Sequence, residues 1–289
     1  MHQGKNDYDN RHQGWIWLLA GTAEGVEIAA SLIDGGWSVE VSVVTASAAK
    51  AYANLAVAAV HQGPLGSDEA IASVLKRRPT WVIDATHPFA VQISAGLQRV
   101  CTREHQRLLR FERQTSTSVR QGGSSTQAMC WHRLDQPAAL RDQCLHGQRL
   151  LIALGSRHLA EAAAAGAAAG ACLFARVMPS CDGVRQALAV GLPADHLAVV
   201  HPRADLAPGA IEAALCRRWQ ITDVICRESG GLIEGLWREL AAEQGLRLWL
   251  LRRPDASPDL EVVQDLEGLM RRLNNDGLNN IDLGCHDGG

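Results

Sequence analysis

The stretch Asp84-Ala85-Thr86-His87-Pro88-Phe89-Ala90 follows the short apolar run Trp81-Val82-Ile83 and decides how the first half of the chain folds. An apolar run of this kind is typical of a strand that a parallel sheet buries on both faces. Pro88 suits the first turn of a helix, where its missing N–H is no loss. We therefore expect an acid, a hydroxyl and an imidazole at the carboxyl end of one strand, the edge where open α/β sheets bind ligands.

Strands alternate with helices on both sides of this stretch. In the first half we expect strands at 15–20, 39–44, 81–84 and 107–111 and helices at 24–33, 68–76 and 88–103. In the second half we expect strands at 149–154, 172–177, 197–200, 223–226 and 246–251 and helices at 157–165, 182–189, 211–218 and 232–242. This alternation predicts right-handed crossovers and parallel sheets. The expected fold class is α/β, with two Rossmann-like or flavodoxin-like parallel-sheet domains and an interdomain cleft.

The domain boundaries follow from composition. The polar segment 114–127, which contains Gly122-Gly123-Ser124-Ser125, carries few apolar residues and is the expected boundary or hinge. We predict a flexible N-terminal arm at 1–14, α/β domains at 15–125 and 126–255, and a C-terminal tail at 256–289. That tail is Asn/Gly/Asp-rich at its end and is predicted to be largely disordered, with one helix at 260–273.

Composition excludes several classes of protein. No uninterrupted run of about 18 apolar residues occurs, and the polar start lacks a signal core, so we expect a cytoplasmic protein with no membrane contact. The net charge of −3 gives no indication of nucleic-acid binding. The eight cysteines show no CxxC pair and no zinc spacing, so they are interpreted as small buried residues of a reducing compartment, and no metal site is expected.

The first predicted strand leads into a turn with two glycines. The candidate residues there are Gly21, Thr22, Glu24 and Gly25. A glycine in this turn lets the backbone approach a phosphate at the helix N-terminus. Because the run is not a full GxGxxG, a tight turn that only needs small residues explains it as well. Its position as the first strand-to-helix turn favours a nucleotide.

The end of the second predicted strand indicates which nucleotide. NAD sites place an acid here to hold the ribose 2′-hydroxyl, and no acid occurs from 41 to 54. Thr45, Ser47 and Lys50 offer hydroxyls and a positive charge, which suit a 2′-phosphate. We therefore predict NADPH as the cofactor, the alternative being that this loop only faces solvent.

Arginines follow several predicted strands. They are Arg110, Arg157, Arg176, Arg203 and Arg227. Guanidinium groups bind carboxylates and phosphates bidentately, and parallel strands would gather these side chains at one edge. Each one alone is explained as a surface arginine, and a coding bias accounts for 25 arginines among the 28 basic residues. Together they predict a ligand with several carboxylates or phosphates.

Two catalytic mechanisms are absent from the sequence. Neither Tyr8 nor Tyr52 is followed by lysine four residues later, as the Tyr-x-x-x-Lys pair of short-chain dehydrogenases requires. No GxSxG nucleophile elbow occurs.

Taken together, these motifs resemble those of one family, the precorrin-6A reductases of cobalamin biosynthesis, whose anaerobic counterpart is cobalt-precorrin-6A reductase. The segments that carry the resemblance are 21–24, 84–90, 109–113, 155–157, 175–179, 229–231 and 252–254. The chain departs from the family at Ala20, where a second glycine is usual, and at Arg227, where a lysine is usual.

The resemblance implies NADPH-dependent reduction of one carbon–carbon double bond of an anionic tetrapyrrole. It implies that the domain at 15–125 binds NADP and the domain at 126–255 binds the substrate. Transient contacts with neighbouring enzymes of the pathway are also expected. Two alternatives stay open: an NADP-binding sensor without turnover, and an NADPH reductase of another polycarboxylate.

The resemblance also implies roles for single residues. Cofactor binding is expected at Gly21, Thr22, Glu24, Gly25, Thr45, Ser47, Asp84 and Thr86. Substrate binding is expected at Arg110, Arg157, Arg176, Arg203, Arg227, Ser229 and Gly230. His87 would be the catalytic proton donor beside the nicotinamide, the alternative being a histidine that hydrogen-bonds the turn in which it lies.

Overall fold

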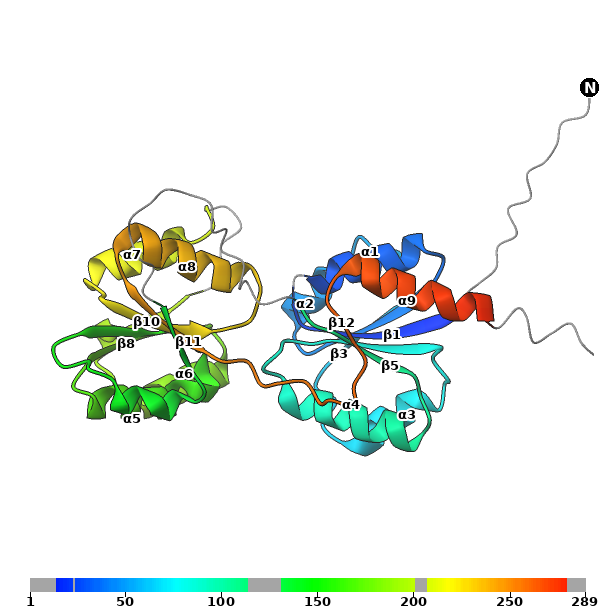
Figure 1. The fold of residues 1–289 in the computed structure, drawn as a ribbon, viewed down its shortest axis with the longest axis horizontal. Coiled ribbons are helices and arrows are strands. Elements are labelled where there is room, and N and C mark those ends of the chain that lie inside the picture. The colour runs from blue at the N-terminus through cyan, green and yellow to red at the C-terminus, as the bar shows by residue number, and fades with distance from the viewer. Residues whose placement is uncertain (1–13, 23, 114–130, 201–206, 280–289) are drawn as a thin grey trace, which may run out of the picture. The chain divides into compact units, whose positions relative to one another are not determined.

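The chain divides into two compact units in a computed structural model that describes residues 14–22, 24–113, 131–200 and 207–279. Unit 1 comprises Met1–Gln114 and Pro254–Gly289, and unit 2 comprises Thr115–Arg253 (Figure 1). Unit 1 is therefore discontinuous in sequence. The expected arm at 1–14, apart from its last residue, and the expected hinge at 114–127 lie outside the described residues.

Unit 1 holds, among its described residues, a six-stranded parallel sheet in the order β3-β2-β1-β4-β5-β12. Its elements are β1 (Trp15–Ala20), α1 (Glu24–Asp34), β2 (Ser38–Val43), α2 (Ala46–Lys50), β3 (Ala59–Gln62), α3 (Asp68–Leu75), β4 (Trp81–Ala85), α4 (Val91–Arg103), β5 (Leu108–Phe111), β12 (Val262–Val263) and α9 (Leu266–Asn279). This is the Rossmann order 3-2-1-4-5-6, in which the chain reverses direction across the sheet between β1 and β4. Of the two expected sheet orders, unit 1 has the Rossmann one.

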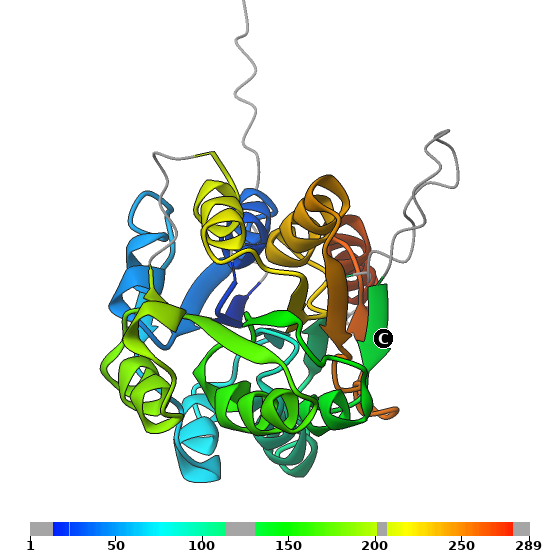
Figure 2. The ribbon, with the colours of Figure 1, turned by 90° about the vertical axis from the view of Figure 1, so that its left-hand side faces the viewer.

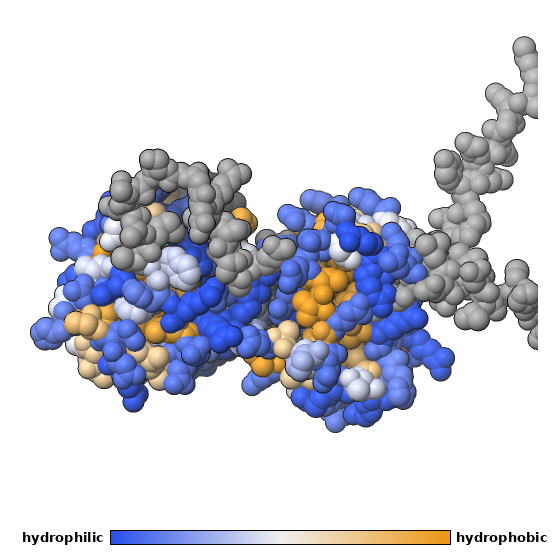
Figure 3. All heavy atoms as spheres, in the orientation of Figure 1, coloured by the Kyte–Doolittle hydropathy of each residue, from blue (hydrophilic) through white to orange (hydrophobic). Residues whose placement is uncertain are grey.

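Both faces of this sheet are covered by helices (Figure 1). Ile16 and Leu18 of β1 pack in the same cluster as residues of α1 and α9. Trp17 and Leu19, which point the other way, pack with residues of α3 and α4. Two buried faces explain why the strands are continuously apolar. In the space-filling view, apolar residues of unit 1 also reach the surface between its helix layers (Figure 3).

Unit 2 repeats this arrangement. Its elements are β6 (Trp131–Leu134), η1 (Pro137–Asp142), β7 (Arg149–Ile152), η2 (Ser156–His158), α5 (Leu159–Ala168), β8 (Cys172–Val177), α6 (Cys181–Ala189), η3 (Ala194–His196), β9 (Leu197–Val199), α7 (Ala210–Arg218), β10 (Asp223–Arg227), α8 (Leu232–Gln244) and β11 (Arg247–Leu251), where η marks a 3-10 helix. The described strands pair in parallel in the order β9-β8-β7-β10-β11-β6, with helices on both faces (Figure 2). The chain reverses direction across this sheet between β7 and β10.

The C-terminal segment differs from the expectation. Instead of a largely disordered tail at 256–289, residues 262–279 supply β12 and α9 to unit 1. Val262 pairs with Arg110 at the edge of the sheet, and Leu269 and Leu273 are fully buried against the face that carries α1. The physical reason is that this face of the sheet needs apolar cover, which an amphipathic helix provides. Residues 280–289 lie outside the described part.

Three further expectations need correction. Helix α4 begins at Val91 and not at Pro88, because the N–H groups of Phe89 and Ala90 donate to His87 and close a turn first. Strands β3 and β6 were not expected from the sequence. Cys144 and Cys181 are exposed, although all cysteines were expected to be buried.

No helix of the described residues is long and apolar enough to cross a membrane. In the same part of the chain, no three His, Cys, Asp or Glu side chains are grouped so that they could hold a metal ion.

Gly25 tests the packing of α1 on β1. A Cβ at Gly25 would fall 2.6 Å from Ala20 Cβ and still closer to the Tyr52 hydroxyl. We expect Gly25→Ala to lower the free energy of unfolding by about 1–3 kcal/mol, because the helix must move off the strand. The matched control is Gly235→Ala in α8, where a Cβ meets nothing within 4 Å. It should raise stability by about 0.5–1 kcal/mol. Urea denaturation followed by tryptophan fluorescence measures both, and equal effects would contradict this packing.

Candidate functional site

A buried ion pair lies under the loop that follows β4. Arg110 of β5 and Asp84 of β4 are 3% and 1% exposed, and Arg110 Nη1 lies 2.7 Å from Asp84 Oδ1. Thr86 donates to the same oxygen from its backbone N–H at 3.0 Å and from its hydroxyl at 2.7 Å. Arg110 Nη1 also donates to Thr86 Oγ1 and to Ser94 Oγ of α4. Strand, loop and helix are thereby held together around one guanidinium.

This arrangement changes how the predicted residues are interpreted. Arg110, expected to bind substrate, is an internal group whose guanidinium holds Asp84, Thr86 and Ser94. Asp84 and Thr86, expected to bind cofactor, are its partners. The other oxygen of Asp84, Oδ2, is buried and accepts no hydrogen bond from the described residues.

His87 lies in the same loop and is half-buried. Its Nδ1 accepts a hydrogen bond from the Phe89 N–H at 3.2 Å. A ring nitrogen that accepts carries no proton, so this bond corresponds to the neutral imidazole with its hydrogen on Nε2. The observed contact is the one expected of a histidine that shapes its own turn. The role of proton donor stays a prediction.

The first strand-to-helix turn of unit 1 is open at Gly21. A Cβ placed on Gly21 would meet no atom of the described residues within 4 Å, so none of them covers the backbone there, and Thr22 follows it half-buried. Gly25 has the different role of close packing described above. Glu24, at the start of α1, pairs with Arg113 at 2.8 Å. This ion pair offsets a negative charge that would otherwise repel a phosphate at the helix N-terminus.

The loop after β2 is exposed, as a ribose-binding loop requires. Thr45 caps α2, its Oγ1 accepting from the Ala48 N–H at 3.2 Å, so its hydroxyl hydrogen is still available to a ligand. Ser47 and Lys50 are exposed beside it. Glu40, in the middle of β2, is 8% exposed and pairs with Arg77 and His61, which lower the pKa of its carboxyl. The Glu40 carboxylate is therefore already engaged by Arg77 and His61.

The corresponding edge of unit 2 is cationic. Arg157 and His158 follow β7, and Arg227 ends β10 on the other side of the split in the sheet. Burial lowers the pKa of Arg227, and the nearby charge of Arg157 lowers it further. Burial and then the charge of Arg227 lower the pKa of His158. When cationic side chains lie close together, each makes the charged form of the other less favourable. An anion bound beside them would be stabilised by these positive charges.

The two turns differ at their glycines. Gly155, which follows β7 with φ 76°, corresponds to Gly21 in unit 1. A Cβ at Gly155 would lie 3.2 Å from Arg227 Nη2, whereas the space beside Gly21 is empty. The position that is open to a phosphate in unit 1 is thus filled by a guanidinium in unit 2.

Other residues expected to bind substrate are placed less favourably. Arg176 is 14% exposed and pairs with Glu212 of α7 at 3.0 Å. Ser229 is buried, and the N–H of Gly230 is taken by the carboxylate of Glu234 at 2.7 Å. Arg203 lies outside the described residues.

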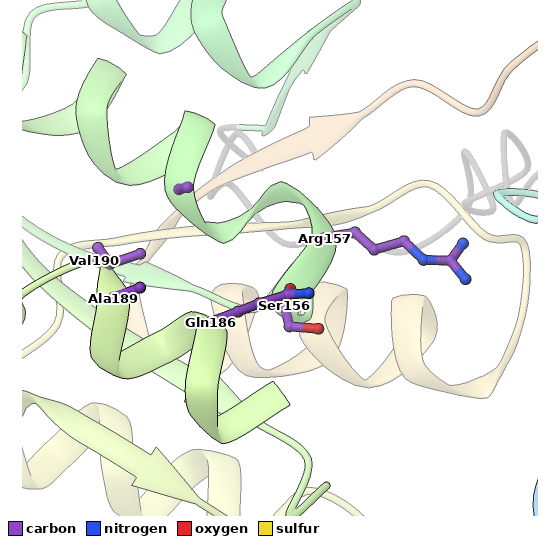
Figure 4. A pocket seen from close by; sticks show the side chains of 6 residues that line it. Ser156, Arg157, Gln186, Ala189 and Val190 are labelled. Atoms are coloured by element: carbon purple, nitrogen blue, oxygen red, sulfur yellow. The ribbon is translucent and has the colours of Figure 1, made fainter. Parts of the chain in front are cut away.

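Arg157 is the exposed member of the unit 2 cluster. It borders a hollow of about 370 Å³ that is also lined by Ser156, Ala160, Gln186, Ala189 and Val190. Figure 4 shows its side chain extending away from the residues of α6 that form the far side. Its guanidinium is therefore accessible to a ligand.

Sequence reasoning missed three residues of these two edges. Ser94 contacts Arg110, and His158 and Glu234 belong to the unit 2 cluster and its turn. Ser94 and Glu234 lie inside helices, where a polar residue is ordinarily interpreted as surface. His158 directly follows Arg157, a signal that was available.

Comparison with known proteins identifies the family. Residues 15–274 match the model of the family described as precorrin-6x reductase CbiJ/CobK. A cobalt-precorrin-6A reductase from Synechocystis is 31% identical over 87% of this chain and 92% of its own length. A precorrin-6A reductase from Rhodobacter capsulatus is 29% identical over 91% of this chain and 96% of its own. A solved structure of CobK precorrin-6A reductase superposes with a TM-score of 0.69 at 26% identity, covering 91% of this chain and 98% of that one. The chain therefore belongs to the precorrin-6x reductase family, whose members are oxidoreductases of cobalamin biosynthesis.

Proposed function

We propose that this protein reduces one ring carbon–carbon double bond of precorrin-6A, or of its cobalt-containing form, with NADPH. The observation that carries the proposal is the contrast between the two glycine turns. Gly21 leaves room for a phosphate, whereas Gly155 lies against the guanidinium of Arg227. The two units, whose sheets share the strand order around their split, are thus suited to different anions, a dinucleotide in unit 1 and a polycarboxylate in unit 2.

The residues of unit 1 fit NADPH. The backbone at Gly21 and Thr22 and the N-terminus of α1 would hold the diphosphate. Thr45, Ser47 and Lys50 would hold the 2′-phosphate, because the loop after β2 carries hydroxyls and a cation and has no acid. The unpartnered Oδ2 of Asp84 suits a donor such as the nicotinamide carboxamide. When bound, the reduced nicotinamide supplies a hydride.

The residues of unit 2 fit a substrate that carries carboxylate arms. Arg157 is exposed, and Arg227 and His158 lie within its electrostatic reach. A carboxylate bound there would reduce the electrostatic repulsion between the guanidiniums of Arg157 and Arg227. Relief of this repulsion would add to the free energy of binding. Arg203 stays in the proposal through the family resemblance alone, and the interdomain cleft stays a prediction.

The protein must also supply a proton. Reduction converts the double bond into two new C–H bonds, one from the hydride and one from a proton at the neighbouring carbon. We propose that His87 delivers this proton as an imidazolium: protonation of Nδ1 releases the Phe89 N–H, and donation of that proton to the substrate leaves the neutral ring, whose Nδ1 accepts from Phe89 again. Water then restores the proton to the ring.

The proposed function is tested by following NADPH oxidation under anaerobic conditions. We expect turnover when either the metal-free or the cobalt-loaded ring is offered, and the faster of the two identifies the substrate. NADPH should exceed NADH at least about tenfold in kcat/KM, because the loop after β2 lacks an acid to hold the 2′-hydroxyl. Equal efficiencies would contradict the 2′-phosphate site. Binding of NADPH without turnover on either ring would instead indicate a sensor.

We expect substitution of Arg110 in unit 1 to lower the stability of the fold, and substitution of Arg157 in unit 2 to weaken substrate binding. Arg110→Met leaves Asp84 buried without its charge partner and should lower the free energy of unfolding by about 3–5 kcal/mol. Arg157→Met changes an exposed residue, so its stability should stay within about 0.5 kcal/mol of wild type. Its substrate KM should rise about tenfold, since a charge-assisted hydrogen bond is lost. Thermal unfolding and steady-state kinetics measure both, and an unchanged KM in Arg157→Met would remove this residue from the substrate site.

The variant His87→Asn separates the proposed role of His87 as a proton donor from its structural role in the turn. Asparagine keeps an acceptor near the position of Nδ1, so the turn at Phe89 is retained, but it cannot serve as an acid. We expect kcat to fall about a hundredfold or more while the melting temperature stays close to wild type. Full turnover by this variant would assign His87 to the turn alone.

A further inference from the structure

The turn that joins β10 to α8 is fixed from inside unit 2 by a buried carboxylate. Gly230 adopts a left-handed conformation with φ 70°, and its N–H donates to Glu234 Oε2 at 2.7 Å. Glu234 is in the first turn of α8 and is 0% exposed. The helix therefore holds the loop that leads into it through one short, charge-assisted hydrogen bond.

Glu234 is held in turn by Arg238, one helical turn further along. Arg238 Nε donates to Glu234 Oε1 at 2.8 Å, and Nη2 lies 2.7 Å from the same oxygen. The guanidinium is 6% exposed and lies over the ring of Trp131 in β6, 4.9 Å from its centroid. Each oxygen of Glu234 thus has its own contact, one to the loop and one to the arginine.

A role in packing alone does not account for this pair. Removing two charges from water costs free energy, and apolar side chains of similar volume often stabilise a fold as well or better. Among the described residues, Arg238 Nη1 makes no hydrogen bond, and Nη2, although it lies close to Glu234 Oε1, is not oriented to donate one. What the pair does supply is a fixed position for the backbone at Gly230.

That backbone continues directly from the cationic edge of unit 2. Arg227 ends β10 three residues earlier, and the intervening chain is tied by the hydrogen bonds from Glu228 N to Leu251 O and from Ser229 N to Arg227 O. Only Glu228 and Ser229 separate Gly230 from Arg227, so the backbone position of Gly230 restricts the end of β10, whose guanidinium lies against Gly155.

We propose that Glu234 is a positioning residue for the substrate: through Gly230 it sets the place of Arg227, which binds a carboxylate arm. This proposal rests on the proposed function. Under this proposal Glu234 is buried and touches no ligand, yet its substitution has a measurable effect on substrate affinity.

The test compares Glu234→Gln with Glu239→Gln, a matched change at an exposed position of the same helix. Glu234→Gln should raise the substrate KM about tenfold, change kcat by less than about threefold and leave the KM for NADPH unchanged. Glu239→Gln should match wild type in all three. A purely structural role would lower the melting temperature of Glu234→Gln and leave the substrate KM of the folded protein unaltered, and that result would overturn the proposal.

A second measurement tests the proposal even if the Glu234→Gln variant fails to fold. Amide hydrogen exchange of the wild-type chain should show Gly230 protected, and exchange as fast as in an unstructured peptide would overturn the proposal. This readout is independent of the substrate. If wild type reduces neither ring, the proposed function fails, while the anchoring of Gly230 by Glu234 is still decided by its exchange rate.

Discussion

A buried carboxylate–guanidinium pair stands beneath the loop that follows the corresponding strand in each sheet. In unit 1 it is Asp84 with Arg110, under the loop after β4, and in unit 2 it is Glu234 with Arg238, under the loop after β10. Both loops leave the strand that borders the split in the sheet, the place where an open α/β sheet binds its ligand. Such pairs are poor sources of stability, because desolvation offsets most of their attraction. Their common position is explained by the need for a rigid loop there.

In the proposed function, one fold is fitted to two different anions. Both sheets have the same strand order around their split, so topology alone does not distinguish them. The distinction lies in the side chains above the first glycine turn. Unit 1 leaves Gly21 uncovered and pairs Glu24 with Arg113, which keeps the helix N-terminus available. Unit 2 places Arg227 over Gly155 with Arg157 nearby, so that charged side chains lie where unit 1 presents its backbone.

The long strands and helices could be predicted from sequence because their signals are local. The apolar run at β1, the glycines after α1 and the serine that caps α3 each mark an element without reference to the rest of the chain. The short strands β3, β6 and β12 carry no such signal, since β12 has only two residues and the four residues of β3 and of β6 include two polar ones, so no apolar run marks them. They are strands because a sheet edge is present to pair with them. Only the three-dimensional fold makes those edges.

The site was predictable in its location and less so in its roles. The strand-end rule placed Arg110, Arg157 and Arg227 at the sheet edges, yet it could not tell which side chains turn inward. Arg110 lies opposite Asp84 in the register of β4 and β5, so its guanidinium pairs with a carboxylate of the same sheet and not with a ligand. Arg157 follows a strand whose neighbour ends in another arginine, so it has no carboxylate beside it there and stays exposed. The identity of the cross-strand neighbour decides between a structural and a binding arginine, and that neighbour is known only once the register is known.

The discontinuity of unit 1 adds a constraint on how the protein completes this unit. Strand β12 and helix α9 are synthesised after all of unit 2, and Leu269 and Leu273 are fully buried in the core that β1 and α1 share. Burying one leucine contributes about 1.5–3 kcal/mol, so the face of the sheet that carries α1 lacks a substantial part of its stabilisation until the chain returns. The edge of β5, which carries Arg110, is also unpaired until β12 arrives. The ion pair that fixes the loop after β4 therefore acquires its final surroundings last, when unit 2 is already complete.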